Sequence, residues 1–299
     1  MADKRHALFF GYGFTAHRLA RRLLDSGWRV SGTVRDTQKP RSTYDGQVKL
    51  HLFDGQDHLL DRDVFADITH VVLSIPPTAA GDPALLSHGE DLRTAPEMRW
   101  IAYLSTPAVY GDRRGGYVSE ETPPNPGSAR GHRRLAAEKA WIDAFADTDI
   151  SVQVFRLSGI YGPGRSPIDQ LRAGSARIIE KPGQVFNRIH VDDIGSILVA
   201  SMERPHKGRI YNVADDEACA SGDVMRYAAA LLGTAAPTPV DFEKADLSPM
   251  ARSFYAECKR LDTTRLKEEL GVTLAYPTYR EGLCAILKDS DAPENTSKN

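Results

Sequence analysis

Short apolar runs alternate with helical spacing along the first half of the chain. Residues 68–75 form a largely apolar run that ends at Pro76, which is typical of a parallel strand buried on both faces. Similar runs cover residues 7–10, 28–34, 48–53, 100–104 and 152–157, and apolar residues recur at helical spacing in residues 16–24 and 129–146. Strands that alternate with helices over about 160 residues predict an open parallel sheet with helices on both faces.

The pattern changes after this point. Residues 159–167 are rich in Gly and Pro, residues 189–202 indicate a turn and a helix, and residues 223–232 and 263–270 have the spacing of amphipathic helices. Two earlier segments are less regular: residues 61–65 predict a short helix, and residues 81–98 predict a loop or a short helix.

These patterns predict an α/β fold in which a Rossmann-type, doubly wound parallel sheet carries a smaller mixed α/β substrate lobe. We expect the Rossmann domain in residues 1–160 and 188–213, and the lobe in residues 161–187 and 214–287. Residues 288–299 are polar and predict a disordered tail.

Composition excludes several classes of protein. The net charge of −2 argues against a nucleic-acid-binding surface spread over the molecule. The three cysteines, Cys219, Cys258 and Cys284, lie far apart and indicate neither a disulfide framework nor a metal site. No segment has the length of a membrane span or the form of a signal peptide, so we expect a cytoplasmic protein. Nothing in the sequence sets the oligomeric state, and an oligomer is possible.

A glycine-rich turn follows the first predicted strand. Gly11 would let the backbone leave the strand sharply, Gly13 would leave room for a pyrophosphate, and Ala16 would let the helix pack close to the strand. Phe14 and Thr15 would begin that helix, whose N-terminus favours negative charge. The turn predicts a dinucleotide site, although any strand-to-helix turn can carry glycines.

The residues after the second strand bear on the choice of cofactor. Arg35 could stack on adenine and pair with a 2′-phosphate, which favours NADP. Asp36 could instead bind the ribose hydroxyls, one residue later than the acid that does so in NAD-binding Rossmann folds, so NAD remains possible. Lys39 and Arg41 could add to the phosphate site or be solvated surface charge.

Other strand ends complete the predicted cofactor site. Asp54 ends the third strand, where it could meet the adenine amine. The end of the fourth strand contributes Ser74, Ile75 and Pro76.

Four stretches together resemble the extended short-chain dehydrogenase/reductases of the NAD(P)-dependent epimerase/dehydratase type. The resemblance runs through about nine-tenths of the chain and implies NAD(P) on the sheet and a substrate pocket between two lobes. It also implies that residues 189–202 return to the Rossmann half. The four stretches are residues 11–16, 105–112, 156–165 and 188–193.

The resemblance implies a catalytic hydroxyl at Thr106, followed by a Tyr-x-x-x-Lys pair on the next helix. Registered on Glu138, that helix instead has Arg130 at the tyrosine position and Arg134 at the lysine position. Arginine stays protonated, so it offers hydrogen bonds and fixed charge but no general base. The Tyr-x-x-x-Lys formed by Tyr255 and Lys259 is expected in the second lobe, far from the nicotinamide.

Several residues could stand in for the missing pair. Tyr110 is a candidate proton donor, although its place in a Val-Tyr-Gly turn also fits a structural role. Weaker candidates are Tyr161, Tyr117 and His132. The arginines at 130, 133 and 134 could receive a phosphate or carboxylate, or could form a solvated face with an Arg134–Glu138 pair.

Two further groups in the matched stretches are expected to be structural. Arg156 is predicted to be buried and paired. Asp192 or Asp193 is predicted to cap the helix that follows.

Two functions follow from these residues. The first is an NADP(H)-dependent oxidoreductase or epimerase acting on an anionic carbonyl or sugar-like small molecule, with Thr106 orienting the carbonyl and an arginine polarising it. The second is a cofactor-binding regulatory or sensor protein without turnover.

Overall fold

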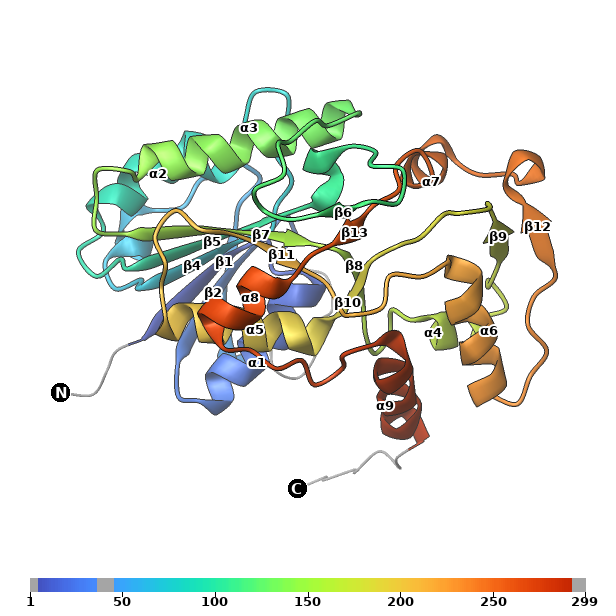
Figure 1. The fold of residues 1–299 in the computed structure, drawn as a ribbon. Coiled ribbons are helices and arrows are strands. Elements are labelled where there is room, and N and C mark those ends of the chain that lie inside the picture. Colours follow the sequence, from blue (N-terminus) through green and yellow to red (C-terminus); the bar gives the residue numbers. More distant parts are fainter. Residues whose placement is uncertain (1–4, 37–45, 292–299) are drawn as a thin grey trace, which may run out of the picture.

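The computed structural model describes residues 5–36 and 46–291. Its centre is a parallel sheet of seven strands in the order β11-β7-β5-β4-β1-β2-β3, which confirms the predicted doubly wound fold (Figure 1). In chain order the strands are β1 (His6–Phe10), β2 (Arg29–Val34), β3 (Lys49–Leu52), β4 (His70–Leu73), β5 (Trp100–Ser105), β7 (Ser151–Leu157) and β11 (Ile210–Val213).

Helices cover both faces of the sheet because its strands are apolar on both sides. In β1, Phe9 packs in the core between the sheet and the helices α1 (Phe14–Asp25), α5 (Val191–Glu203) and α8 (Thr264–Leu270). The neighbouring Phe10 packs on the opposite face, between the sheet and the helices α2 (Pro83–Thr94) and α3 (Ala129–Ala144). The two layers lie below and above the sheet in Figure 1.

The structure corrects two boundaries predicted from sequence. Residues 81–98, expected as a loop or short helix, contain the 12-residue helix α2. Asp82 caps it by accepting from the amides of Ala84 and Leu85, Pro83 occupies its first turn, and Leu92 is buried. Residues 288–291, expected in a disordered tail, belong to α9 (Tyr279–Asp291), and the rest of the predicted tail lies outside the described residues. The predicted short helix at 61–65 is the 3-10 helix η2 (Arg62–Phe65).

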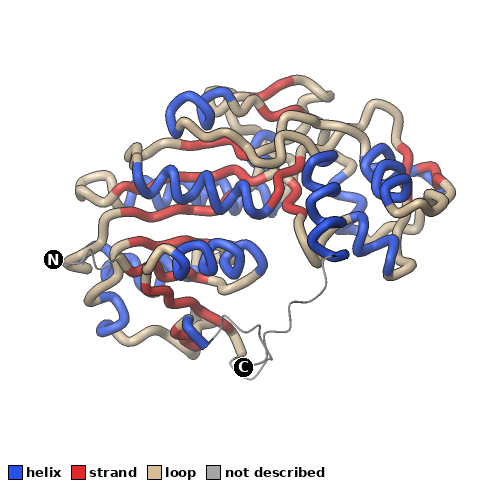
Figure 2. Tube along the Cα trace, turned by 90° about the horizontal axis from the view of Figure 1, so that it is seen from below, coloured by secondary structure: helices blue, strands red, loops and turns tan. Residues whose placement is uncertain are grey.

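The second lobe has a small core of its own. Helices α4 (Pro167–Arg172), α6 (Ser221–Leu231) and α9 enclose it, with Ile168, Val224 and Leu283 at its centre. Two short strands, β9 (Ile178–Glu180) and β12 (Pro239–Asp241), pair in parallel beside it, followed by η4 (Phe242–Lys244) and α7 (Pro249–Phe254). Figure 2 shows these helices gathered at one end of the sheet.

Two further parallel pairs connect the lobe to the sheet. Strand β8 (Gly159–Tyr161) pairs with β10 (Arg188–His190), after which α5 returns to pack beside α1. Strand β6 (Tyr117–Val118) pairs with β13 (Arg260–Leu261).

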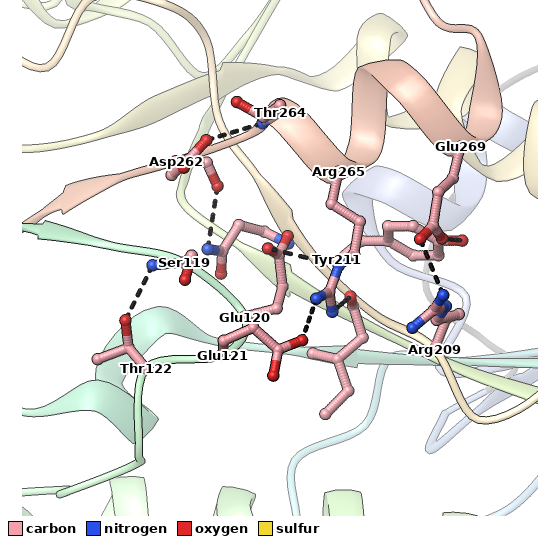
Figure 3. A network of polar contacts seen from close by, with 12 residues as sticks. Ser119, Glu120, Glu121, Thr122, Arg209, Tyr211, Asp262, Thr264, Arg265 and Glu269 are labelled. Atoms are coloured by element: carbon pink, nitrogen blue, oxygen red, sulfur yellow. Dashed lines mark hydrogen bonds and ion pairs between the residues drawn. The ribbon is translucent and has the colours of Figure 1, made fainter.

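A polar network closes the edge of the sheet at β11 (Figure 3). The buried carboxylate of Glu120 accepts from the backbone amide of Asn212 at 2.7 Å, and the Asn212 side-chain amide donates to the carbonyls of Val118 and Asp262. At the same edge, the Tyr211 hydroxyl donates to Glu269 at 3.0 Å. The segments that carry β6 and β13 are therefore bonded to the sheet as well as to each other.

Candidate functional site

The glycine turn leaves β1 at the carboxyl edge of the sheet. Gly11 has a φ of +94°, and a Cβ there would lie 2.7 Å from Ser74 Oγ and 2.8 Å from Ile75 Cγ2. Its amide donates to Thr33 Oγ1 at 2.9 Å, and the amide of Tyr12 donates to the Thr33 carbonyl at 2.8 Å. Only glycine fits at position 11, and Thr33, which the sequence did not single out, fixes the turn.

The N-terminus of α1 is open. Gly13 is the N-cap residue, no side chain caps the helix, and its first turn holds no acidic residue. A Cβ at Gly13 would have no neighbour within 4 Å, whereas Ala16 is buried against the core. Free amides and the positive end of the helix dipole therefore face open space, as an anion requires. Phe14 turns away toward the second lobe, where its ring lies 5.6 Å from the guanidinium of Arg165.

The other predicted cofactor residues lie along the same edge. Arg35 is exposed just after β2. Ser74 donates to the Gly11 carbonyl at 2.7 Å, so it supports the turn, and Ile75 and Pro76 follow it. Asp54 accepts from the amides of Gln56 and His58 and from the His58 ring, and the His58 contact, with these amides, holds the pKa of that carboxyl well below its usual range. Positions 39 and 41 lie outside the described residues.

Thr106 directly follows β5 and caps the short helix η3 (Pro107–Tyr110). Its hydroxyl accepts from the amide of Ala108 at 3.3 Å. Helix α3 begins against this turn, since a Cβ at Gly131 would lie 2.9 Å from the Ala108 carbonyl oxygen. The predicted hydroxyl and the start of the predicted catalytic helix are thus neighbours.

The two arginines of α3 point to different partners. Arg134 donates to the Leu104 carbonyl at 2.9 Å and to the Tyr103 hydroxyl at 3.2 Å, both on the strand that leads into Thr106. The guanidinium of Arg130 lies 5.4 Å from the ring centre of Phe254 in α7. The proposed Arg134–Glu138 pair does not form.

Glu138 instead belongs to a buried cluster that also holds Tyr110. Arg156 and Glu138, each 2% exposed, form a two-point ion pair at 3.1 and 2.7 Å, which confirms the expectation for Arg156. Ser105 donates to the same carboxylate at 2.5 Å. Tyr110 is fully buried beside Arg156, and its hydroxyl donates to Asn212 at 2.7 Å. This enclosed and bonded hydroxyl fits the structural role considered for Tyr110, and its catalytic role stays a prediction.

The second-lobe pair requires another correction. Lys259 is not remote from the sheet edge: its Nζ lies 3.3 Å from the carbonyl oxygen of Pro107, next to Thr106, and 2.5 Å from Glu257. Tyr255 does lie in the lobe, with its ring against Phe186 and Phe242. The spacing in sequence could not show this because the chain crosses back between α7 and β13.

The remaining candidates are scattered. Tyr161 is buried in the lobe and donates to the Thr278 carbonyl at 3.4 Å, while Tyr117 and His132 are exposed. Neither aspartate caps α5: His190 does, Asp192 pairs with Arg18 of α1, and Asp193 accepts from the amides of residues 275 and 276.

Two hollows lie on the lobe side of the molecule. One of about 270 Å³ is bordered by β9, the start of α6 and Tyr255. The other, about 320 Å³, lies beside β13 and is bordered by Asp215 and Lys267. Asp215 is 5% exposed, one of its carboxyl oxygens has no hydrogen-bond partner, and burial raises its pKa to about 7. No sequence motif singles out Asp215.

The chain belongs to the NAD dependent epimerase/dehydratase family, whose model matches residues 11–214. This match spans the glycine turn, Thr106 and the β8–β10 connection. Among the described residues, no helix is both long and apolar enough to cross a membrane.

Similar proteins support the fold and leave the activity open. A structure of a functionally unknown conserved protein from Silicibacter pomeroyi is 47% identical, covers 96% of this chain and 99% of its own, and has a TM-score of 0.87. Protein YeeZ of Escherichia coli K12 is 28% identical over 89% of this chain and 94% of its own. MoeE5, solved in complex with UDP-glucuronic acid and NAD, shares the fold with a TM-score of 0.76 at 23% identity, covering 95% of this chain and 99% of its own.

Proposed function

We propose that this protein binds NADP(H) at the Gly11 turn and acts as an oxidoreductase or epimerase on an anionic carbonyl or sugar-like small molecule. The open N-terminus of α1 carries the proposal. It offers uncapped amides beside Gly13, where no side chain intrudes. Family membership and the NAD bound by MoeE5 support a dinucleotide at this position.

Each part of the cofactor would have its own residues in this site. The glycine turn would hold the pyrophosphate, Arg35 the 2′-phosphate, and Asp54 the adenine. Ile75 and Pro76 would border the cofactor after β4. When bound, the nicotinamide supplies hydride chemistry.

Substrate would be held at the Thr106 turn. The Thr106 hydroxyl would orient a carbonyl oxygen, and Arg134, which donates to the Leu104 carbonyl, would supply a fixed positive charge near it. Arg130 could attract an anionic substrate from its place beside Phe254. Fixed donors aimed at developing negative charge lower a barrier without exchanging protons.

A fluorescence titration of the purified protein with NADPH and NADH tests the cofactor proposal. We expect saturable NADPH binding that is tighter than NADH binding. Failure of both nucleotides to bind would contradict it. Binding of NADPH without turnover of any carbonyl compound would instead favour a cofactor-dependent sensor, a reading supported by the buried hydroxyl of Tyr110 and the absence of tyrosine from α3.

A further inference from the structure

Lys259 presents its ammonium group to the turn that carries Thr106. Its Nζ lies 3.3 Å from the Pro107 carbonyl oxygen and 2.5 Å from Glu257 Oε2. The side chain of Lys259 is 8% exposed and that of Glu257 is 17% exposed. Lysine is seldom enclosed to this extent unless it is paired, and here Glu257 is the partner.

The backbone on both sides of Lys259 is anchored to the Rossmann half. The amide of Cys258 donates to Asp112 at 2.8 Å, and the Cys258 carbonyl accepts from the amides of Arg113 and Gly115. On the other side of Lys259, the amide of Arg260 donates to the Gly116 carbonyl at 2.9 Å. Figure 1 shows this segment crossing from α7 to β13 beside β6. The fold therefore holds the backbone of Lys259 beside the segment that carries Thr106, and the contacts with Pro107 and Glu257 place its ammonium group.

The chemistry of lysine fills a gap in the proposed site. Helix α3 offers only arginines at this turn, since its single lysine, Lys139, is exposed and pairs with Asp143. Unlike arginine, lysine can release a proton. Its ammonium has three N–H donors, of which Glu257 and Pro107 occupy two within the described structure.

We propose that Lys259, with Glu257 as its partner, is a catalytic residue that bonds the substrate oxygen oriented by Thr106. This inference rests on the proposed function. The reduced nicotinamide, when bound, would supply hydride to a carbonyl carbon, and Lys259 would give a proton to the carbonyl oxygen, so that one N–H bond breaks and one O–H bond forms. A proton from water then returns to the amine, so the reaction consumes one hydride and one solvent proton.

The charge of Lys259 gives a test that needs no substrate. Oxidised nicotinamide carries a positive charge that the reduced ring lacks, so a nearby ammonium disfavours NADP⁺ relative to NADPH. Dissociation constants for both nucleotides, measured by calorimetry at low salt, give the ratio Kd(NADP⁺)/Kd(NADPH). We expect Lys259→Gln to lower this ratio roughly threefold to tenfold and Glu257→Gln to raise it.

Two controls separate charge from structure. Lys259→Arg keeps the charge and should keep the wild-type ratio, and Lys139→Gln removes a distant surface charge and should leave it unchanged. If Lys259 is only structural, both dissociation constants will change together in Lys259→Gln and their ratio will stay constant. That result overturns the inference about Lys259 and leaves the proposed function standing. If the wild type binds neither nucleotide, the proposed function fails, and this inference fails with it.

Discussion

Folding and cofactor binding make different demands on Gly13. Its φ of −108° and ψ of −160° are open to any residue, and an added Cβ would touch nothing. The fold therefore tolerates a side chain there, while a pyrophosphate would not. Gly11 is the opposite case, because its φ of +94° and its contact with Ser74 exclude a side chain even without a ligand.

Gly13→Asp should separate the two demands. Aspartate is a preferred N-cap residue, so stability should be kept or raised by a few tenths of a kcal/mol in thermal melts. NADPH binding should weaken at least roughly a hundredfold, because the carboxylate occupies and repels the anion site. Gly13→Asn, which caps without charge, measures the steric part. Unchanged NADPH affinity in Gly13→Asp would place the cofactor elsewhere.

Arg35→Ala tests the choice between the two nucleotides. Loss of a hydrogen-bonded charge pair to a 2′-phosphate should weaken NADPH binding roughly tenfold to a hundredfold. NADH lacks that phosphate, so its dissociation constant should change by no more than about twofold. Titrations of the wild type and of Arg35→Ala with each nucleotide at one ionic strength make the comparison. Equal losses of affinity for NADPH and NADH would refute the NADP preference.

Burial of Asp215 should make stability depend on pH. Its carboxyl has a folded pKa of about 7, above the ordinary value of 3.8, so the folded state binds more protons than the unfolded state between these limits. Its contribution to stability is therefore present below about pH 4 and is lost as pH rises to 7. Asp215→Asn cannot ionise and should be more stable than wild type at pH 8 by on the order of 4 kcal/mol, with little difference at pH 4. Denaturant titrations at both values check this, and an equal effect at both would contradict it.

At the level of elements, α3 is held to the sheet by a buried charge pair. Glu138 of α3 meets Arg156 of β7 and Ser105 of β5, and both charged side chains are 2% exposed. The pair connects the helix that follows Thr106 to two strands that converge at the candidate site.

Glu138→Ala should destabilise the protein by about 3 to 5 kcal/mol, since it leaves a buried guanidinium without its partner. Lys139→Ala, on the exposed side of the same helix, should stay within about 0.5 kcal/mol. Urea unfolding measures both changes. A loss of only about 1 kcal/mol in Glu138→Ala would show that water or another acceptor replaces the carboxylate.

Sequence patterns predicted the sheet well because its strands are short, apolar and separated by helices. The first βαβ unit and the buried Arg156 needed only local periodicity and strand-end logic. Residues 81–98 predicted no more than a loop or a short helix because the apolar residues of α2 are few and its cap at Asp82 was not recognised. Lys259 was misplaced because its position depends on the pairing of β13 with β6, residues about 140 apart in the chain, which no local pattern encodes.

At the scale of the whole molecule, the two halves are joined by backbone pairing as well as packing. β8 with β10 and β6 with β13 bind the lobe to the sheet, and the His190 ring lies between Tyr161 and Tyr276 at 5.2 and 4.0 Å. Burial lowers the pKa of His190 to about 4, so its ring stays neutral near pH 7. Connections of this kind favour unfolding of both halves together.

The placement of the tryptophans allows this cooperativity to be measured. Trp28, Trp100 and Trp141 all lie in the cores around the large sheet, so tryptophan fluorescence reports that half alone. Circular dichroism at 222 nm also reports α6 and α9 of the lobe. The two melting curves should coincide. NADPH at about 100 times its Kd should raise both midpoint temperatures by the same amount, which corresponds to about 2.7 kcal/mol of added folding stability. If NADPH delayed only the fluorescence transition, the lobe would be a separate folding unit, and the position of Lys259 at the Thr106 turn would depend on docking and not on folding.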